Sequence, residues 1–311
     1  RWDTEPEPLR AFLRPEAECL QDELQDINTP HRRRVEIGDR LPVILPAPRK
    51  GTGLVDGLPD IDWVDIAPGA VELEDGAGTF AIAYPFKIAR YPVTHAQFRA
   101  FAEAADGYCN PAWWGNDAQR YEVARTLGGV ADQPRVTVSW FEAAAFCAWL
   151  SARSAMALPP GSVARLPLEW EWQLAATGGD AARAYPWGPW DARMANSLES
   201  GLGRTVAVGL NPQASWGEGD GPLDMAGNVW EWCHNLYQEP QRMLTDKDGE
   251  VPRVLRGGSW YVSQDLCRCA YRLSYLPGLR EDGSGFRLVC APPISETLIS
   301  ESLISGKKRR K

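Results

Sequence analysis

The sequence lacks the features that would point to a membrane, a secretory route or a nucleic acid. No apolar run approaches the ~18 residues that a membrane-spanning helix needs, and no signal-peptide pattern begins the chain. The formal net charge is −8, so there is no excess of the basic residues that bind a phosphate backbone. We therefore expect a cytoplasmic protein that binds no membrane and does not have nucleic acid as its main partner.

Cysteine is present in an odd number with scattered spacing. Seven cysteines make a poor framework for disulfides, and without a secretion signal we expect them to be reduced. Most should be small buried apolar residues. They are Cys19, Cys109, Cys147, Cys233, Cys267, Cys269 and Cys290.

Tryptophan, glycine and proline, in contrast, are abundant. Fourteen tryptophans are unusual, since a buried indole needs a partner for its N–H group. The 29 glycines and 25 prolines favour turns and irregular backbone. The chain of 311 residues is long enough for one large domain or two. We expect a compact, loop-rich protein with little regular structure.

Three short words that look rigid punctuate residues 256–290. They are 257–260 (GGSW), 267–272 (CRCAYR) and 285–289 (GFRLV). From Gly285 to Cys290 apolar residues alternate with Arg287, which predicts a half-buried strand.

Between these words lie runs without periodicity and with mixed chemistry. Such runs are loops, and loops on a stiff frame are where binding usually occurs. Two tyrosines among them suit contact with a partner. The predicted binding face consists of Tyr261, Val262, Ser263, Asp265, Leu266, Leu273, Ser274, Tyr275, Leu276, Gly278, Leu279, Asp282 and Ser284.

The words RGGSW, CR-x-A-x-R and GFRLV resemble the C-terminal signature of the formylglycine-generating enzyme, or sulfatase-modifying factor, family. DMAGNVWEW at 224–232 resembles that family's most distinctive word. The resemblance implies an α+β, C-type-lectin-like fold with much irregular structure over residues 56–292.

The pattern of constant words with interchangeable gaps also resembles the variable proteins of diversity-generating retroelements. In that group, adenines of a template are randomised, which mostly alters Asn codons. Tyr, Val, Ser, Asp, Leu and Gly, all found in these gaps, are residues that an Asn codon reaches in this way. The resemblance implies a variable region at 254–290. The alternative is a set of ordinary surface loops that do not vary.

Short-range signals predict several elements of the main domain. Residues 58–66 alternate and should form its first strand, and 69–82 should form a hairpin. Thr94 with Gln97, and Ser139 with Glu142, have the spacing of capping boxes that begin helices. Gly178 and Gly179 should end a third helix.

The two ends of the chain differ from this domain. Residues 1–55 combine helical apolar spacing with an Arg-rich stretch at 31–40 and a Pro- and Gly-rich stretch at 41–53. Pro8 and Pro15 can each begin a short helix. This predicts helical segments and an extended connector, which either links to another domain or packs on the same one. Residues 293–311 form a polar, basic tail.

The family's enzymes bind calcium at the loop that matches DMAGNVWE. Carried over by position, Asp224 and Glu231 would supply side-chain oxygens, and Gly227 and Val229 backbone carbonyls. Hard oxygen ligands with carboxylates suit calcium. The alternative is a hydrogen-bonded loop without a metal. A second calcium site would begin at Asn196, but the loop after it is short and lacks the family's aspartate.

The family's oxidase chemistry requires two cysteines that bind copper and activate oxygen. Their positions here are Val262 and Cys267, and valine can form no thiolate and ligate no soft metal. Cys269 could be proposed as a replacement partner in a Cys-x-Cys pair, but in the wrong place. We expect Cys267 to be a buried structural residue and no copper to bind.

Other relatives use iron held by a histidine cluster. This chain has only His31, His95 and His234, which lack helical spacing. We therefore expect a non-catalytic protein that binds an unknown protein or other macromolecule through the predicted binding face. The alternative is an oxidase or another redox enzyme of the family.

Overall fold

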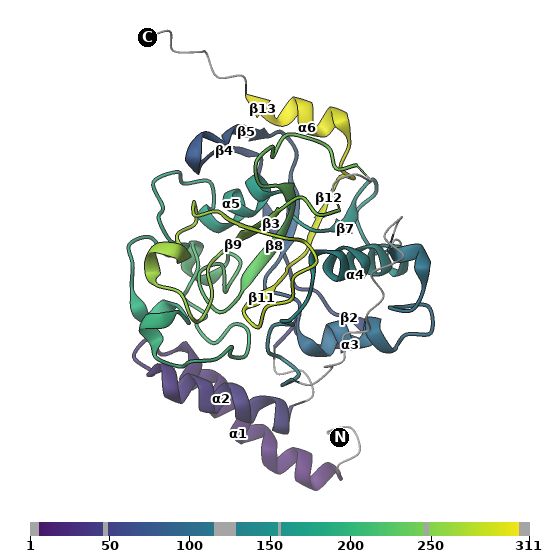
Figure 1. Cartoon of the computed structure of the whole chain (residues 1–311). Helices are drawn as coiled ribbons and strands as arrows, with labels where there is room; N and C mark the ends of the chain where they lie inside the picture. The colour runs from purple at the N-terminus through teal and green to yellow at the C-terminus, as the bar shows by residue number, and fades with distance from the viewer. Residues whose placement is uncertain (1–5, 46–48, 115–128, 155–156, 246–248, 305–311) are drawn as a thin grey trace.

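The computed structural model describes residues 6–45, 49–114, 129–154, 157–245 and 249–304. Within them the arrangement is α+β (Figure 1). The helices are α1 (Glu7–Gln25), α2 (His31–Ile44), α3 (His95–Glu103), α4 (Trp140–Arg153), α5 (Glu169–Thr177) and α6 (Glu296–Ser302). The strands are β1 (Leu54–Val55), β2 (Leu58–Pro59), β3 (Trp63–Ile66), β4 (Gly69–Leu73), β5 (Gly78–Ile82), β6 (Phe86–Ala89), β7 (Val163–Arg165), β8 (Trp230–Leu236), β9 (Arg253–Arg256), β10 (Leu273–Tyr275), β11 (Ser284–Gly285), β12 (Val289–Ala291) and β13 (Leu303–Ile304). None of these helices is both long and apolar enough to cross a membrane.

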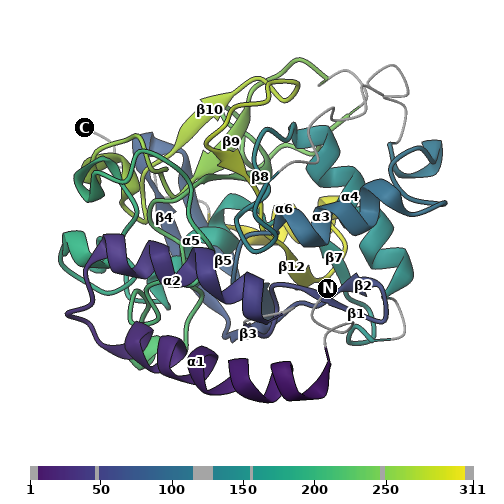
Figure 2. The same cartoon turned by 90° about the horizontal axis from the view of Figure 1, so that it is seen from below.

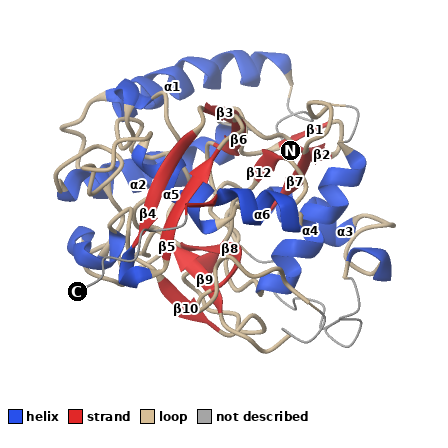
Figure 3. Ribbon diagram, turned by 90° about the horizontal axis from the view of Figure 1, so that it is seen from above, coloured by secondary structure: helices blue, strands red, loops and turns tan. Residues whose placement is uncertain are grey.

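Two four-stranded sheets form the centre of the body. One has the order β10-β9-β8-β11 and the other β3-β6-β12-β7. The segment from β11 to β12 joins them, because β11 pairs with β8 and β12 pairs with β6 and β7. A further sheet, β13-β5-β4, crosses the upper side of the body (Figure 3). The GFRLV word therefore lies where the two main sheets meet.

The predicted starts of α3 and α4 and the predicted end of α5 are confirmed. The Thr94 hydroxyl accepts from the backbone N–H of Gln97, whose side chain accepts from the backbone N–H of Thr94 at 3.0 Å, so α3 begins at His95. Ser139 and Glu142 form the same box at the start of α4. Gly178 ends α5 with φ of 59°.

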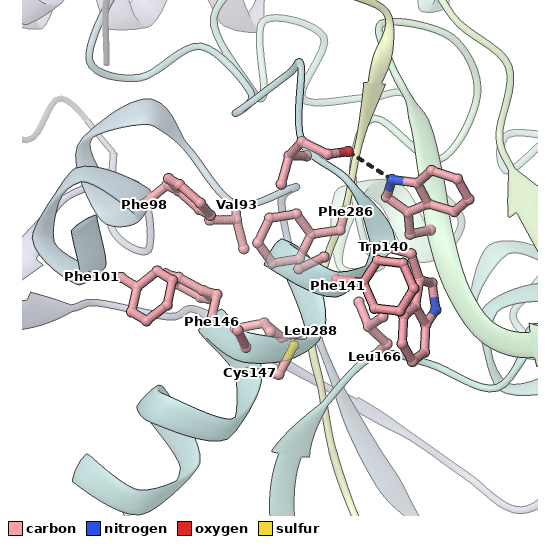
Figure 4. Close-up of a cluster of buried hydrophobic side chains, with 14 of the residues drawn as sticks. Val93, Phe98, Phe101, Trp140, Phe141, Phe146, Cys147, Leu166, Phe286 and Leu288 are labelled. Atoms are coloured by element: carbon pink, nitrogen blue, oxygen red, sulfur yellow. Dashed lines mark hydrogen bonds between the residues drawn. The ribbon is translucent and has the colours of Figure 1, made fainter. Parts of the chain in front are cut away.

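Aromatic side chains fill the core. Between α3 and α4, Phe286 packs edge-on against Phe98 and Phe146 (Figure 4), with ring centroids 6.3 and 5.4 Å apart. Two of the buried indoles find backbone acceptors: Trp232 Nε1 donates to the Val138 carbonyl and Trp140 Nε1 to the Cys233 carbonyl, both at 2.9 Å. Such bonds let tryptophan serve as a core residue.

The N-terminal helices form a hairpin that lies against the body (Figure 2). Apolar residues of both helices, including Leu24 and Leu41, pack with Val206 and Leu210. Buried Arg34 donates from Nη1 to the carbonyls of Leu24 and Leu210 at 2.7 and 2.5 Å. The hairpin therefore packs on the same body as the strands.

Three local predictions in this part of the chain were wrong. Pro15 lies inside the continuous helix α1 instead of starting a helix. Leu41–Ile44 belongs to α2 because the side chains of Leu41 and Ile44 are buried in the hairpin, so the connector begins later. Residues 58–66 divide into β2 and β3, since the Asp60 carbonyl accepts from Gln97 Nε2 at 2.6 Å and leaves the ladder. The hairpin at 69–82 is confirmed as β4 and β5.

The prediction of one half-buried strand over 285–290 was also wrong. β11 ends at Gly285 and β12 begins at Val289. Every residue from 285 to 290 is buried, including Arg287. Alternation predicted water on the Arg287 side, but a buried carboxylate lies there instead.

Candidate ligand-binding site

Three arginines anchor the constant words in the core. Arg272 holds the Glu169 carboxylate through Nε and Nη2 at 2.7 and 2.9 Å. Arg287 holds Glu231 in the same two-pronged manner at 2.6 and 2.7 Å. Charge-assisted pairs with two bonds have a narrow geometry, so these words form a stiff frame.

The third anchor belongs to the RGGSW word. Arg256 is fully buried and donates from Nη2 to Gln173 Oε1 at 2.6 Å and to the Cys269 carbonyl at 2.7 Å. Gly258 follows with φ of 78°, and a Cβ there would lie 2.5 Å from Cys267 Sγ. Glycine is required because the two words approach closely at this point.

The residues between the words lie mainly at the surface. Six members of the predicted binding face are exposed, namely Tyr261, Asp265, Leu276, Gly278, Leu279 and Asp282. Six are half-buried, namely Val262, Ser263, Leu266, Leu273, Ser274 and Tyr275. Ser284 is buried at 2% exposure.

Two details of this face differ from the prediction. Ser284 is covered because it pairs with Trp230 in the parallel β11–β8 ladder. Residues 273–275 form strand β10 instead of a loop, since they pair with β9. The Tyr275 ring lies 6.5 Å from that of Trp232, so Tyr275 supports the core as well as the surface.

The two positions of the family's cysteine pair meet in one apolar cluster. Cys267 is fully buried with Tyr185 and Ala226, and Val262 packs against this cluster. Burial raises the pKa of Cys267 to about 12, so its thiol is neutral near pH 7. One neutral thiol facing a valine does not fit a copper ion, which prefers thiolate ligands.

Cys267 and Cys269 do not form a substitute pair. They belong to separate apolar clusters, and the segment between them is no strand. The backbone N–H of Cys269 donates to the Ala184 carbonyl at 2.8 Å, and its side chain belongs to the apolar cluster that contains Trp170 and Trp172 of α5.

The histidines are separated as expected. His31 contacts the Ala192 carbonyl at 2.6 Å, whereas His95 starts α3 and His234 lies in β8. Burial lowers the pKa of His95 to about 4 and that of His234 to about 3. Across the described ranges, no three histidine, cysteine, aspartate or glutamate side chains come close enough to share a metal ion.

The residues carried over as calcium ligands have other partners. Both Glu231 oxygens accept from Arg287, and Oε2 also accepts from Trp172 Nε1 at 2.7 Å. Asp224 accepts from the Gly209 N–H at 2.7 Å. The Arg287 guanidinium already binds both oxygens of the Glu231 carboxylate, which a calcium ion would need as a ligand. This arrangement therefore does not fit calcium.

The other two members of this set are backbone groups in a strained turn. The Gly227 carbonyl accepts from the Val229 N–H at 3.0 Å, and Asp224 and Asn228 have φ of 57° and 68°. The Asn228 side chain contacts another segment of the chain, since its Oδ1 accepts from Asn196 Nδ2 at 3.1 Å. These bonds hold the turn within a hydrogen-bonded loop.

Two surface residues next to the face were missed. The Leu198 N–H donates to the Val262 carbonyl at 2.9 Å, and the Leu198 side chain is 60% exposed. Glu199 accepts from the Gln264 N–H at 2.9 Å. Their local sequence gives no signal for this position, since only tertiary contacts bring residues 198–199 to the face.

Comparison with known proteins agrees with this geometry. Residues 62–292 match the model of the sulfatase-modifying factor enzyme 1-like domain. Serine/threonine-protein kinase pkn1 of Chlamydia pneumoniae is 33% identical over 69% of this chain and 34% of its own length. Hercynine oxygenase of Mycolicibacterium thermoresistibile is 31% identical over 81% of this chain and 61% of its own length. The chain thus spans only about a third of the kinase and under two thirds of the oxygenase.

Solved structures show the same fold. Treponema denticola variable protein 1 has a TM-score of 0.55 at 23% identity, covering 78% of this chain and 97% of that one. PvdO from Pseudomonas aeruginosa has a TM-score of 0.57 at 22% identity, covering 79% and 100%. The predicted α+β, C-type-lectin-like fold is confirmed, and so is the likeness in fold to a variable protein. The chain belongs to the sulfatase-modifying factor family.

Proposed function

We propose that this chain is a non-catalytic ligand-binding protein that displays an interchangeable surface on its C-type-lectin-like scaffold. One observation carries the proposal: most residues of the constant words are buried and two of their arginines hold buried carboxylates, while twelve of the thirteen residues of the predicted binding face reach solvent at least in part. Substitutions at exposed loop positions change chemistry without disturbing the frame. The ligand is a protein or another macromolecule.

The apolar cluster around Cys267 supports the non-catalytic part of the proposal. Val262 replaces one thiol of the family's pair, and the pKa of the remaining thiol is raised to about 12 by burial. A relative, the inactive C-alpha-formylglycine-generating enzyme 2 of mouse, is 29% identical over 65% of this chain. At least one relative of this chain is therefore named as inactive.

Binding is tested with a displayed library of random peptides selected on the immobilised chain. The selected peptides should no longer bind a variant that combines Tyr261→Ala, Leu279→Ala and Asp282→Asn. The matched control combines Phe12→Ala, Val43→Ala and Asp22→Asn, which removes an aromatic, an aliphatic and an acidic group from exposed positions on the N-terminal hairpin. Clones that bind both variants equally would contradict the proposal.

Diversification is tested by the neighbouring DNA. We expect a near-copy of the segment that encodes residues 254–290, differing at adenines, beside a gene for a reverse transcriptase. If all strains carry the same segment and none has such a copy, diversification is contradicted, and the chain is a binding scaffold whose loops do not vary.

A second candidate function is an oxidase reaction, favoured by the names of two relatives. Formylglycine-generating enzyme of Streptomyces coelicolor is 30% identical over 65% of this chain, and hercynine oxygenase is named above. The discriminating measurement is copper-dependent oxygen uptake with a cysteine-containing, sulfatase-type peptide. We expect none; uptake that disappears in a Cys267→Ser variant would establish the oxidase instead.

A further inference from the structure

Strand β10 forms the free edge of a sheet inside the predicted binding face. It is the terminal strand in the order β10-β9-β8-β11, and among the described residues it pairs only with β9. It lies at the outer margin of the molecule in two opposite views (Figures 2 and 3). An edge strand presents unpaired backbone N–H and C=O groups, on which an extended chain can add a strand.

Tyr275 of β10 belongs to a group of two tyrosines and two carboxylates that interact with one another. Burial and the neighbouring Glu281 carboxylate raise the pKa of Tyr275, which also lies within electrostatic range of Tyr261. Tyr261 in turn lies near Asp282 and Glu281. The Glu281 carbonyl accepts from the N–H groups of Thr137 and Ser284 at 3.0 and 3.2 Å, so its backbone is held in place.

The nearby cations are already paired elsewhere. Arg280 donates to Glu142 at 2.8 Å, and Arg268 forms an ion pair with Glu74. In the parts of the chain that the structure covers, no lysine or arginine forms an ion pair with Glu281 or Asp282. The edge is therefore flanked by aromatic rings and uncompensated negative charge, which together attract a cationic side chain.

We propose that β10 binds an extended segment of a partner protein as an added strand, with a lysine or arginine of that segment placed between the two tyrosines and the two acids. This inference rests on the proposed function and names the chemistry of its ligand. Leu273 and Tyr275 share one face of β10 and Ser274 the other. A cation on the Tyr275 side of the added strand therefore reaches Glu281, while the next residue points away.

The geometry disfavours a second copy of this chain as the occupant. Pairing β10 with β10 would bring two sets of Glu281 and Asp282 together, and like charges across a strand pair are destabilising. β10 is also only three residues long and is followed closely by Pro277, which lacks an N–H group. Backbone bonds alone are then few, so the basic side chain supplies much of the affinity and the specificity.

The test selects displayed random peptides on the full-length chain and then measures synthetic copies of the enriched sequences by fluorescence anisotropy. We expect enrichment of lysine or arginine among β-branched and aromatic residues. A Glu281→Gln, Asp282→Asn variant should bind these peptides about fivefold to tenfold more weakly. The control variant Glu18→Gln, Asp22→Asn removes the same charge from exposed positions on α1 and should bind normally.

A second experiment, on the peptide backbone, distinguishes strand addition from simple charge attraction. N-methylation at successive peptide residues should abolish binding at alternate positions only, because N–H groups of a strand alternate between the ladder and solvent. Enriched peptides that lack basic residues, no enrichment, or indifference to the Glu281 and Asp282 changes would overturn the inference. So would a methylation pattern without alternation.

These failures are distinguishable from failure of the proposed function. If Tyr261→Ala abolishes binding but N-methylation of the peptide does not weaken it, the face binds ligands without using the edge of β10. If neither change matters, the face is not the binding site.

Discussion

Arg287 clamps the carboxylate of Glu231 with two hydrogen bonds of 2.6 and 2.7 Å, and neither side chain reaches solvent. The pair joins the GFRLV word to the WEW word across 56 residues of sequence. It fastens the segment between the two main sheets and so holds one side of the predicted binding face. It also occupies the carboxylate that a calcium ion would need.

Breaking this pair should destabilise the whole body. We expect Arg287→Met to lower the free energy of unfolding by about 3–5 kcal/mol, because Glu231 would remain buried without a counter-charge. The Glu231→Gln, Arg287→Met double variant should recover part of the loss. Urea unfolding followed by tryptophan fluorescence measures both.

The control for this prediction is a surface ion pair. Arg204 and Asp39 are 2.6 Å apart with both side chains nearly half exposed, so Arg204→Met should change stability by less than about 1 kcal/mol. Equal losses for the buried and the exposed pair would mean that the clamp contributes little to the frame.

Calcium should leave the stability of the chain unchanged. Binding would have to displace the Arg287 guanidinium from Glu231, which costs one charge-assisted pair before the ion gains a ligand. Melting curves with millimolar calcium, with magnesium and with a chelator should therefore coincide. A rise in melting temperature specific to calcium and reversed by the chelator would show that Arg287 moves aside and that the family's site is in use.

The thiols should divide by burial when the native chain is treated with iodoacetamide at pH 8. Cys19 and Cys109 are exposed and should react. Cys267 should not, because burial raises its pKa to about 12 and leaves almost no reactive thiolate. Peptide mass spectrometry before and after denaturation gives the comparison. Rapid labelling of Cys267 in the native chain would point to an open, activated thiol and revive the oxidase alternative.

Asp224 should make stability fall as pH rises from about 4 to 6. Burial raises the pKa of Asp224 to about 6, whereas an unfolded aspartate titrates near 3.9. The native state therefore binds the proton more tightly, and deprotonation destabilises it across this window.

Asp224→Asn should remove this dependence while its amide oxygen still accepts from Gly209. The stability of the variant relative to wild type should increase by on the order of 2 kcal/mol between pH 4 and pH 7. Urea unfolding at each pH gives the difference, in which the titrations of His95 and His234 cancel. A difference that stays constant with pH would show that the Asp224 carboxyl is solvated.

The predictions that the structure confirmed rest on neighbouring residues, although not every local prediction held, since Pro15 lies inside α1. The capping boxes at Thr94 and Ser139 and the glycine stop at Gly178 depend on contacts within a few residues, so the sequence determines them. The same holds for the hairpin of β4 and β5. Predictions that assumed which side faces water did less well: Arg287 and Ser284 are buried by strands from distant parts of the chain.

The candidate site divides in the same manner. Its constant words and the gaps between them can be recognised in the sequence, and so can the valine at position 262. That Val262 packs against the cluster of Cys267, and that Leu198 and Glu199 adjoin the face, depends on contacts between segments far apart in the chain.

The sequence by itself determined the family's words, the starts of α3 and α4, the end of α5 and the valine at position 262, because each depends on single residues or on close neighbours. Only the tertiary structure decided that Glu231 faces a guanidinium and that β10 is a free edge. The reason is physical: burial and strand pairing are set by segments that approach from elsewhere in the chain, and no local pattern records which segment that will be.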